Sequence, residues 1–152
     1  MRPAHGATIF DWLRSLALTA ALLAAFAASA PAPAVAEESP AYILDVGDVT
    51  AAVGEQAVMR ATLKIRDGYR ILKAYNNRVI KLSSFDDGVA FAHDMVAADL
   101  VDGALIFNIG LQATKPGKHP INGLFRVGYI VGTDEMDMVS LRLIANVIGT
   151  GQ

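Results

Sequence analysis

The sequence predicts an all-β fold, an antiparallel β-sandwich of about seven or eight short strands. The first observation behind this prediction is the alternation of apolar and polar residues in several runs, the period of a strand with one face on a core. The second is that clusters of Gly, Asp, Asn and Pro separate these runs, as turns do. Neither a repeat nor a linker interrupts the pattern, so it predicts one domain over residues 42–150.

Residues 1–36 are expected to be a secretory signal peptide that is cleaved from the mature protein. Basic residues precede a short uncharged apolar run at 15–28, and small residues follow it. The A-V-A motif at 34–36 predicts the cleavage point. The alternative is a membrane anchor, which needs about 20 apolar residues, and this run is shorter and is stopped by Pro31. The sequence thus predicts a periplasmic or secreted protein with no membrane span in its mature chain.

The composition limits the classes of partner and of chemistry. The chain has 13 Lys and Arg against 15 Asp and Glu, a net charge of −2. This balance argues against nucleic acid as a partner. There is no cysteine, which excludes thiol chemistry and means that stability must come from the core alone. A domain of this size buries about two thirds of its unfolded surface, enough to fold without cross-links.

The first half of the domain is expected to form a hairpin and two further strands. Residues 37–41 are polar and contain a proline, so they predict a disordered start. Asp67-Gly68 is the strongest short hairpin signal, and it predicts that the strand after it pairs with the strand before it. Asn76-Asn77 predicts another turn. The expected strands in this half cover 42–46, 56–66, 69–75 and 78–83.

The second half contains the clearest alternation, after an ambiguous segment. Residues 89–102 allow one helical turn or an edge strand, and we predict a strand followed by a loop. Three alternating runs at 104–114, 121–131 and 138–147 predict three consecutive strands of one antiparallel sheet. The strands together are typical of an immunoglobulin-like sandwich, and a small barrel is the alternative. The residues expected on the core face of the three runs include Leu105, Phe107, Ile109, Leu111, Ile121, Phe125, Val127, Tyr129, Leu141, Leu143 and Val147.

Two segments carry a family resemblance. One is VMRATLKIRDGYRILKAYNNRVIKL at 58–82, and the other is FNIGLQATKPGKHPINGLFRVGYIVGTDEMDMVSLRLIANV at 107–147. They resemble the start and the later part of the periplasmic N-terminal domain of DsbD-type thiol–disulfide interchange proteins. The resemblance implies an immunoglobulin-like fold and a periplasmic location. That family's two cysteines would fall near 128–138, where this chain has none, so its electron-transfer activity is not implied.

Methionine and histidine side chains are candidate ligands for Cu(I). Met136 and Met138 are two apart, so in an extended segment they face the same side. Thioether sulfur and imidazole suit a soft cation, and His119 and His93 complete the candidate set. The structural alternative is that Met138 fills a core gap and that the histidines are ordinary surface residues. The acidic turn at 134–137 lacks the register of a calcium loop.

Five cations form a second candidate site, which we call the basic stripe. The expected strand before Asp67 places three of them on its outward face, and the expected hairpin partner carries the other two. Such a patch on an acidic domain can dock an anionic partner or a membrane surface. The alternative is a solvated sheet face whose charges protect an edge from aggregation. The basic stripe consists of Arg60, Lys64, Arg66, Arg70 and Lys73.

The function predicted from these features is binding without catalysis. The sequence has no nucleophile-elbow, phosphate-loop or H-E-x-x-H motif. We expect an exported accessory module without a cofactor that interacts with a periplasmic or inner-membrane protein. One alternative is a small copper-handling protein that uses the Met and His ligands. Another is a cysteine-less relative of the interchange domain that keeps only partner docking.

Overall fold

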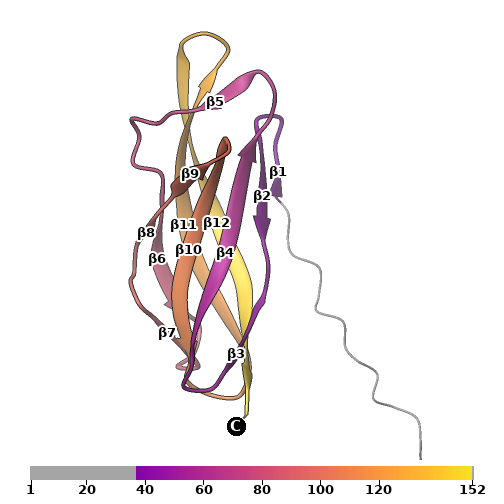
Figure 1. Ribbon diagram of the computed structural model, residues 1–152, viewed down its shortest axis with the longest axis vertical. Coiled ribbons are helices and arrows are strands. Elements are labelled where there is room, and N and C mark those ends of the chain that lie inside the picture. Colours follow the sequence, from indigo (N-terminus) through magenta and orange to yellow (C-terminus); the bar gives the residue numbers. More distant parts are fainter. Residues whose placement is uncertain (1–36, 152) are drawn as a thin grey trace, which may run out of the picture. The chain divides into compact units, whose positions relative to one another are not determined.

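The protein is a β-sandwich in the computed structural model, which describes residues 37–151; the expected signal peptide at 1–36 lies outside them. The described residues form twelve strands in two six-stranded sheets and no helix (Figure 1). The prediction of an all-β sandwich is therefore confirmed. The strand number exceeds the predicted one because several edge strands are only two to four residues long.

The first sheet is antiparallel throughout. Its strands are β1 (Glu37–Glu38), β2 (Tyr42–Val46), β4 (Gln56–Ile65), β7 (Val89–Phe91), β9 (Asp99–Val101) and β10 (Ala104–Ala113). Their order is β1-β2-β4-β10-β7, and β9 pairs with the beginning of β10. The segment 37–41 was expected to be disordered, but Glu37 and Glu38 pair with β2 and Ala41 is buried. The main-chain pairing with β2 holds this polar start in place.

The second sheet contains the two longest strands. Its strands are β3 (Val49–Ala52), β5 (Tyr69–Ile71), β6 (Arg78–Ser84), β8 (Val96–Ala97), β11 (Gly117–Val131) and β12 (Glu135–Thr150). Their order is β3-β12-β11-β6-β8, and β5 pairs with the end of β11. The pair of β3 with β12 is parallel, whereas the others are antiparallel.

The three long alternating runs do not form one sheet, which corrects the prediction. β10 pairs with β4 in the first sheet, whereas β11 and β12 pair with each other in the second. The connection between Ala113 and Gly117 crosses from one sheet to the other. Alternation shows which side chains face the core, but both sheets of a sandwich face the same core, so it cannot assign a strand to a sheet.

The expected hairpin of β4 with β5 is also absent, since β5 pairs with β11. A tight two-residue hairpin of type I′ needs both central residues at positive φ. At Asp67-Gly68 only Gly68 has positive φ, 87°, and Tyr69 N donates to the Arg66 carbonyl at 3.2 Å. This geometry fits a type II turn with glycine at its third position. The turn therefore directs the chain across to the other sheet.

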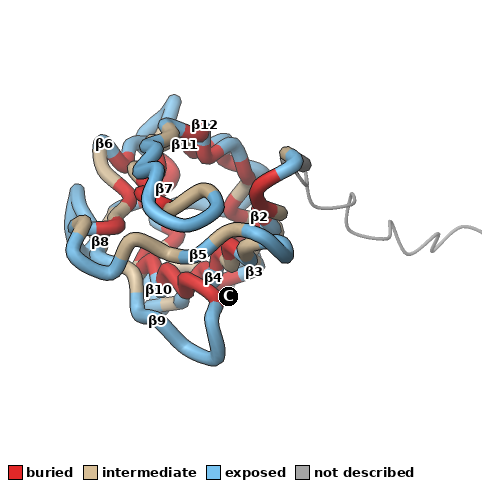
Figure 2. The backbone as a smooth tube through the Cα atoms, turned by 90° about the horizontal axis from the view of Figure 1, so that it is seen from above, coloured by how far each residue is buried: buried red, intermediate tan, exposed pale blue. Residues whose placement is uncertain are grey.

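The core lies between the two sheets. Phe107 of β10 meets Phe125 of β11 edge to face, with ring centroids 4.8 Å apart, and both residues are fully buried. Most of the inward residues predicted on β10, β11 and β12 are buried as expected. Val131 and Val139, also predicted to face the core, are half-buried, and Ile106, predicted to point away from it, is buried. Figure 2 shows the buried stretches on the facing strands and the exposed stretches on the loops. One contiguous cluster of apolar side chains therefore joins the sheets.

A buried histidine closes one end of the sandwich, and we call this arrangement the His119 clamp. His119 Nδ1 lies 3.0 Å from Asp86 Oδ2, and Nε2 lies 3.0 Å from the Lys115 carbonyl oxygen. A carboxylate and a carbonyl only accept, so both bonds are made at once when both ring nitrogens donate, which is the case in the imidazolium form. The clamp links the turn after β6 to the turn before β11. The hydrogen bond with Asp86 is also the main cause that raises the His119 pKa and lowers the Asp86 pKa.

The clamp makes the stability of the protein depend on pH. The raised His119 pKa gives a contribution that is complete below about pH 6.5 and is lost as the pH rises through the folded pKa. The lowered Asp86 pKa gives a contribution that is present above about pH 4 and is lost in acid. We expect the unfolding temperature to fall as the pH rises above about 6.5, and His119→Gln to remove this slope. His93→Gln, at an exposed loop position, is the matched control and should keep it. An unchanged slope in His119→Gln would contradict the clamp.

Candidate binding pocket

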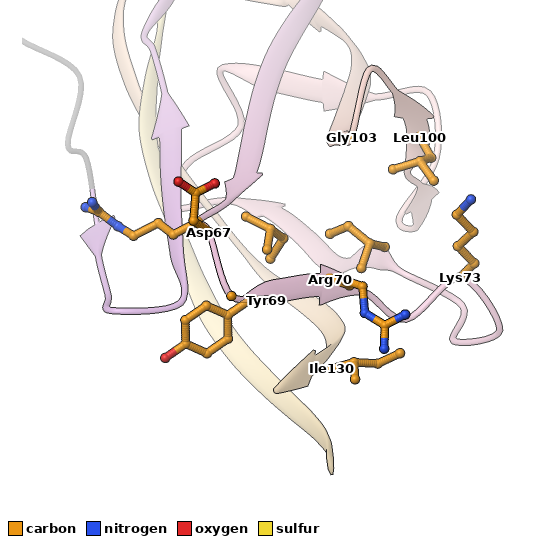
Figure 3. A pocket seen from close by; sticks show the side chains of 11 residues that line it. Asp67, Tyr69, Arg70, Lys73, Leu100, Gly103 and Ile130 are labelled. Carbon is orange, nitrogen blue, oxygen red and sulfur yellow. The ribbon is translucent and has the colours of Figure 1, made fainter. Parts of the chain in front are cut away.

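A pocket of about 730 Å³ lies at the other end of β11, between the edge strands β5 and β9 of the two sheets (Figure 3). We call it the end pocket. Figure 3 shows Leu100 and Gly103 of the β9–β10 hairpin across the pocket from Tyr69 and Arg70 of β5. The residues that line it are Ile65, Arg66, Asp67, Gly68, Tyr69, Arg70, Ile71, Lys73, Leu100, Gly103 and Ile130.

The pocket exists because the sandwich is incompletely covered at this end. β6 begins only at Arg78, so on the side away from β12 the end of β11 has the short β5 and the segment 72–77 beside it. The β9–β10 hairpin forms the facing wall. Its turn residues Asp102 and Gly103 both have positive φ, 48° and 78°, as a type I′ turn requires. The space between the two walls is lined by aliphatic side chains that would otherwise be covered by a strand.

Asn77 holds the 72–77 segment against β11. Its side chain is buried, its Oδ1 accepts a hydrogen bond from Gly128 N at 2.8 Å, and its Nδ2 donates to the carbonyls of Leu72 and Tyr75 at 3.3 and 3.2 Å. The amide therefore replaces the strand neighbour that β11 lacks at this point. A smaller cavity of about 190 Å³ is lined partly by the same segment and shares Ile71, Lys73 and Leu100 with the end pocket. The two hollows are thus neighbours along one groove.

Positive charge surrounds the end pocket. Three of its lining residues, Arg66, Arg70 and Lys73, are basic, and Asp67 is the one acidic residue among those that line it. Arg66 Nε donates to the Ser39 carbonyl at 3.0 Å, and an Arg70 guanidinium nitrogen donates to the Thr133 carbonyl at 2.7 Å. The bond of Arg70 fixes its guanidinium group without neutralising it, because a carbonyl carries no net charge. The pocket therefore combines an apolar interior with a cationic margin.

A tyrosine cluster stands beside the pocket. The Tyr129 ring packs against those of Tyr42 and Tyr69, with centroids 6.3 and 6.0 Å away. Its hydroxyl donates to Asp137 Oδ2 at 2.8 Å. Burial, followed by the hydrogen bond with Asp137, raises the pKa of Tyr129 to about 12. Its phenol therefore stays neutral at physiological pH and acts as a hydrogen-bond donor.

The structure divides the basic stripe into two groups. Arg66, Arg70 and Lys73 line the end pocket, whereas Arg60 and Lys64 do not. The latter two are exposed on the outer face of β4, between inward residues of the same strand. The division follows from the type II turn, which sends Arg70 and Lys73 to the second sheet instead of a hairpin partner of β4. A single charged face on one sheet is therefore not formed.

The candidate metal ligands also separate. Met136 and Met138 lie near the beginning of β12 with 68% and 64% of their surface exposed, so the alternative in which Met138 fills a core gap is wrong. His119, buried in its clamp, is eleven positions along β11 from the partner of Met136, which is roughly 36 Å of strand. His93 lies exposed between β7 and β8. In residues 37–151 no group of three or more His, Asp or Glu side chains is placed to hold a metal ion.

Several pocket residues were not predicted from the sequence. Leu100 falls in the ambiguous segment 89–102, which forms β7, β8 and β9 and not one strand and a loop. Asp102-Gly103 stands before an alternating run and is the signal that would have identified this hairpin. Ile71 was assigned only to a strand, and Asn77 only to a turn. Nothing in their local sequence indicates a shared cavity.

Comparisons with known proteins leave the family open. No protein-family model matches this chain, and no curated protein matches it. It is similar to the crystal structure of the S-layer protein SbsC domains 4 and 5, with 18% identity and a TM-score of 0.36, over 76% of this chain and 54% of that chain. A structure of SbsC domains 1–6 matches with 17% identity and a TM-score of 0.36, over 78% of this chain and 14% of that chain. Similarity at this level supports no inference about function, and the DsbD-type resemblance stays a prediction.

Within residues 37–151 no helix has the length and apolar character that crossing a membrane requires. The expectation that the mature chain has no such span agrees with this finding for the described residues.

Proposed function

We propose that this protein is an exported, non-catalytic binding module that interacts with another protein through the end pocket. The observation that carries the proposal is the combination of half-buried or exposed aliphatic residues and three basic side chains in one hollow between two strand edges. Leu100 is 41% exposed in this hollow. Large apolar residues beside charged ones at an open cavity are typical of sites that bind a ligand or a partner.

The chemistry of the pocket favours binding over catalysis. Its ionisable residues are Arg66, Asp67, Tyr69, Arg70 and Lys73. These guanidinium, ammonium, phenol and carboxylate groups supply charge and hydrogen bonds to a bound partner. An interaction with a periplasmic or inner-membrane protein fits this set best.

Site-specific photocross-linking in cells tests the proposal. A photoreactive residue in place of Lys73, at the pocket, should give a discrete protein adduct after export. The same residue in place of Ile144, which is 57% exposed on the outer face of β12, is the matched control and should not give that adduct. Arg70→Glu should weaken the adduct at position 73. Equal adducts at both positions would argue against a partner site at the pocket.

A further inference from the structure

We propose that the end pocket takes an extended peptide segment of the partner protein, in which apolar and acidic residues alternate, and that its backbone pairs with the free edges of β9 and β5. The inference rests on the proposed function and names the chemistry of the partner. Three features support it: the direction of the backbone groups at the two edges, the apolar interior, and the position of the cations.

In β9, the N–H and C=O of one residue point away from the neighbouring strand β10. Val101 and Ala104 flank the two-residue turn of the β9–β10 hairpin and form its closing hydrogen-bonded pair. Hydrogen-bonded pairs occur at every second residue in an antiparallel ladder, so Leu100 turns its N–H and C=O to the outer edge. Ala98, two residues before, uses the same edge to donate to the Asn77 carbonyl at 2.9 Å. The same edge therefore already makes one main-chain hydrogen bond, at Ala98, on the side of the groove.

β5 presents the corresponding groups on the opposite wall. Leu72 N donates to the Gly128 carbonyl and Gly132 N donates to the Gly68 carbonyl, at 3.0 and 3.3 Å. The bonds of β5 to β11 thus involve residues 68, 70 and 72, and Ile71 directs its N–H and C=O away from β11. An extended chain between the walls can reach Leu100 on one side and Ile71 on the other. Addition of a strand to exposed sheet edges is a recurrent mode of peptide binding.

The side chains of such a segment would meet two different environments. Alternate residues of an extended chain point to opposite sides. On the inner side lie Ile65, Ile71 and Leu100, which suit aliphatic residues. On the outer side lie Arg70, which is on the solvent face of the second sheet beside Ile130, and the exposed Lys73. Carboxylates match this cationic margin, so alternation of aliphatic and acidic residues is the complementary pattern.

Binding of capped, fluorescently labelled peptides to the exported protein tests this inference. The probe has about eight residues of alternating valine and glutamate, the length of a typical strand. We expect it to bind about tenfold or more tightly than a valine–lysine peptide of the same length. N-methylation of alternate amides of the probe should weaken binding by at least about tenfold, because it removes the groups that pair with a strand edge. Decanoate serves as an apolar carboxylate without a peptide backbone.

Variants of the protein test the contributions of charge and of backbone pairing to peptide binding separately. The double variant Arg70→Glu/Lys73→Glu should weaken binding of the valine–glutamate probe by about tenfold or more. Arg60→Glu/Arg142→Glu makes the same change in net charge on exposed positions outside the pocket and should change binding less than about twofold. Leu100→Pro removes the outward N–H without breaking the ladder with β10, and it should bind more weakly than Leu100→Ala, which keeps that N–H. Circular dichroism of each variant checks that the sandwich is intact.

The outcomes distinguish this inference from the proposed function. Tight binding that depends on Arg70, Lys73 and unmethylated amides supports an acidic extended segment. Equal binding of the N-methylated peptide or of decanoate overturns strand pairing, and equal binding of the valine–lysine peptide overturns the acidic pattern. A cross-link at position 73 without binding of the valine–glutamate probe would leave the proposed function standing and refute the peptide chemistry. Loss of the cross-link itself would refute the proposed function.

Discussion

Replacing Phe107 with alanine is expected to lower the free energy of unfolding by about 3–5 kcal/mol. The Phe107 ring is fully buried and packs edge to face on Phe125 of the opposite sheet, 4.8 Å between centroids. Its removal would leave a cavity at the contact that joins the two sheets. Since domains of this size are stable by about 5–15 kcal/mol, the loss is a large share of the total. Urea unfolding followed by circular dichroism measures it.

Phe85→Ala is the matched control for this prediction. Phe85 follows β6 and is 71% exposed, so the same change of side chain should alter stability by less than about 0.5 kcal/mol. A comparable loss in both variants would contradict the assignment of the core, because it would mean that burial does not separate the two rings.

Asn77→Leu is expected to cost about 2–3 kcal/mol, since it leaves the buried Gly128 N–H without its acceptor. Leucine has a similar volume but can replace neither the acceptor nor the two donor bonds to Leu72 and Tyr75. The 72–77 segment should then detach from β11. Hydrogen exchange of the Gly128 amide should become faster than in the unsubstituted protein, and this local readout distinguishes detachment from a general loss of stability.

Asn76→Leu provides the control at the neighbouring position. The Asn76 side chain is exposed, and its substitution should leave both the stability and the exchange of the Gly128 amide close to those of the unsubstituted protein. If Asn77→Leu were equally harmless, the amide would not be what holds the segment. The stability measurement and the exchange measurement must agree for the assignment to stand.

The sequence predicted the inner faces of the long strands better than their partners. Alternation in β4, β10, β11 and β12 records which side chains avoid water, and those positions are buried. The sheet to which each strand belongs depends on how the chain turns between strands. Asp67-Gly68 and Asp102-Gly103 have the same letters, yet only the second has both residues at positive φ and makes a tight hairpin. A dipeptide does not determine its own dihedral angles when packing favours another strand partner.

The candidate site was predicted only in part. The run of cations after residue 60 is visible in the sequence, but it does not reveal that Arg70 and Lys73 leave the first sheet. Leu100 comes from a segment whose composition allowed both helix and strand. His119, expected at the surface, is buried because Asp86 and the Lys115 carbonyl satisfy its ring. The place of each of these residues depends on pairing between strands that are far apart in the sequence, and a single sequence indicates such pairing only weakly.

The parallel pairing of β3 with β12 has a consequence for the order of folding. Val49, near the beginning of the described chain, pairs with Val147, near its end. During folding, β2 can pair with β4 early because the two strands are close in sequence, but among the described residues β3 has a ladder partner only in β12. Closure of the second layer at β3 therefore has to wait until β12 is in place.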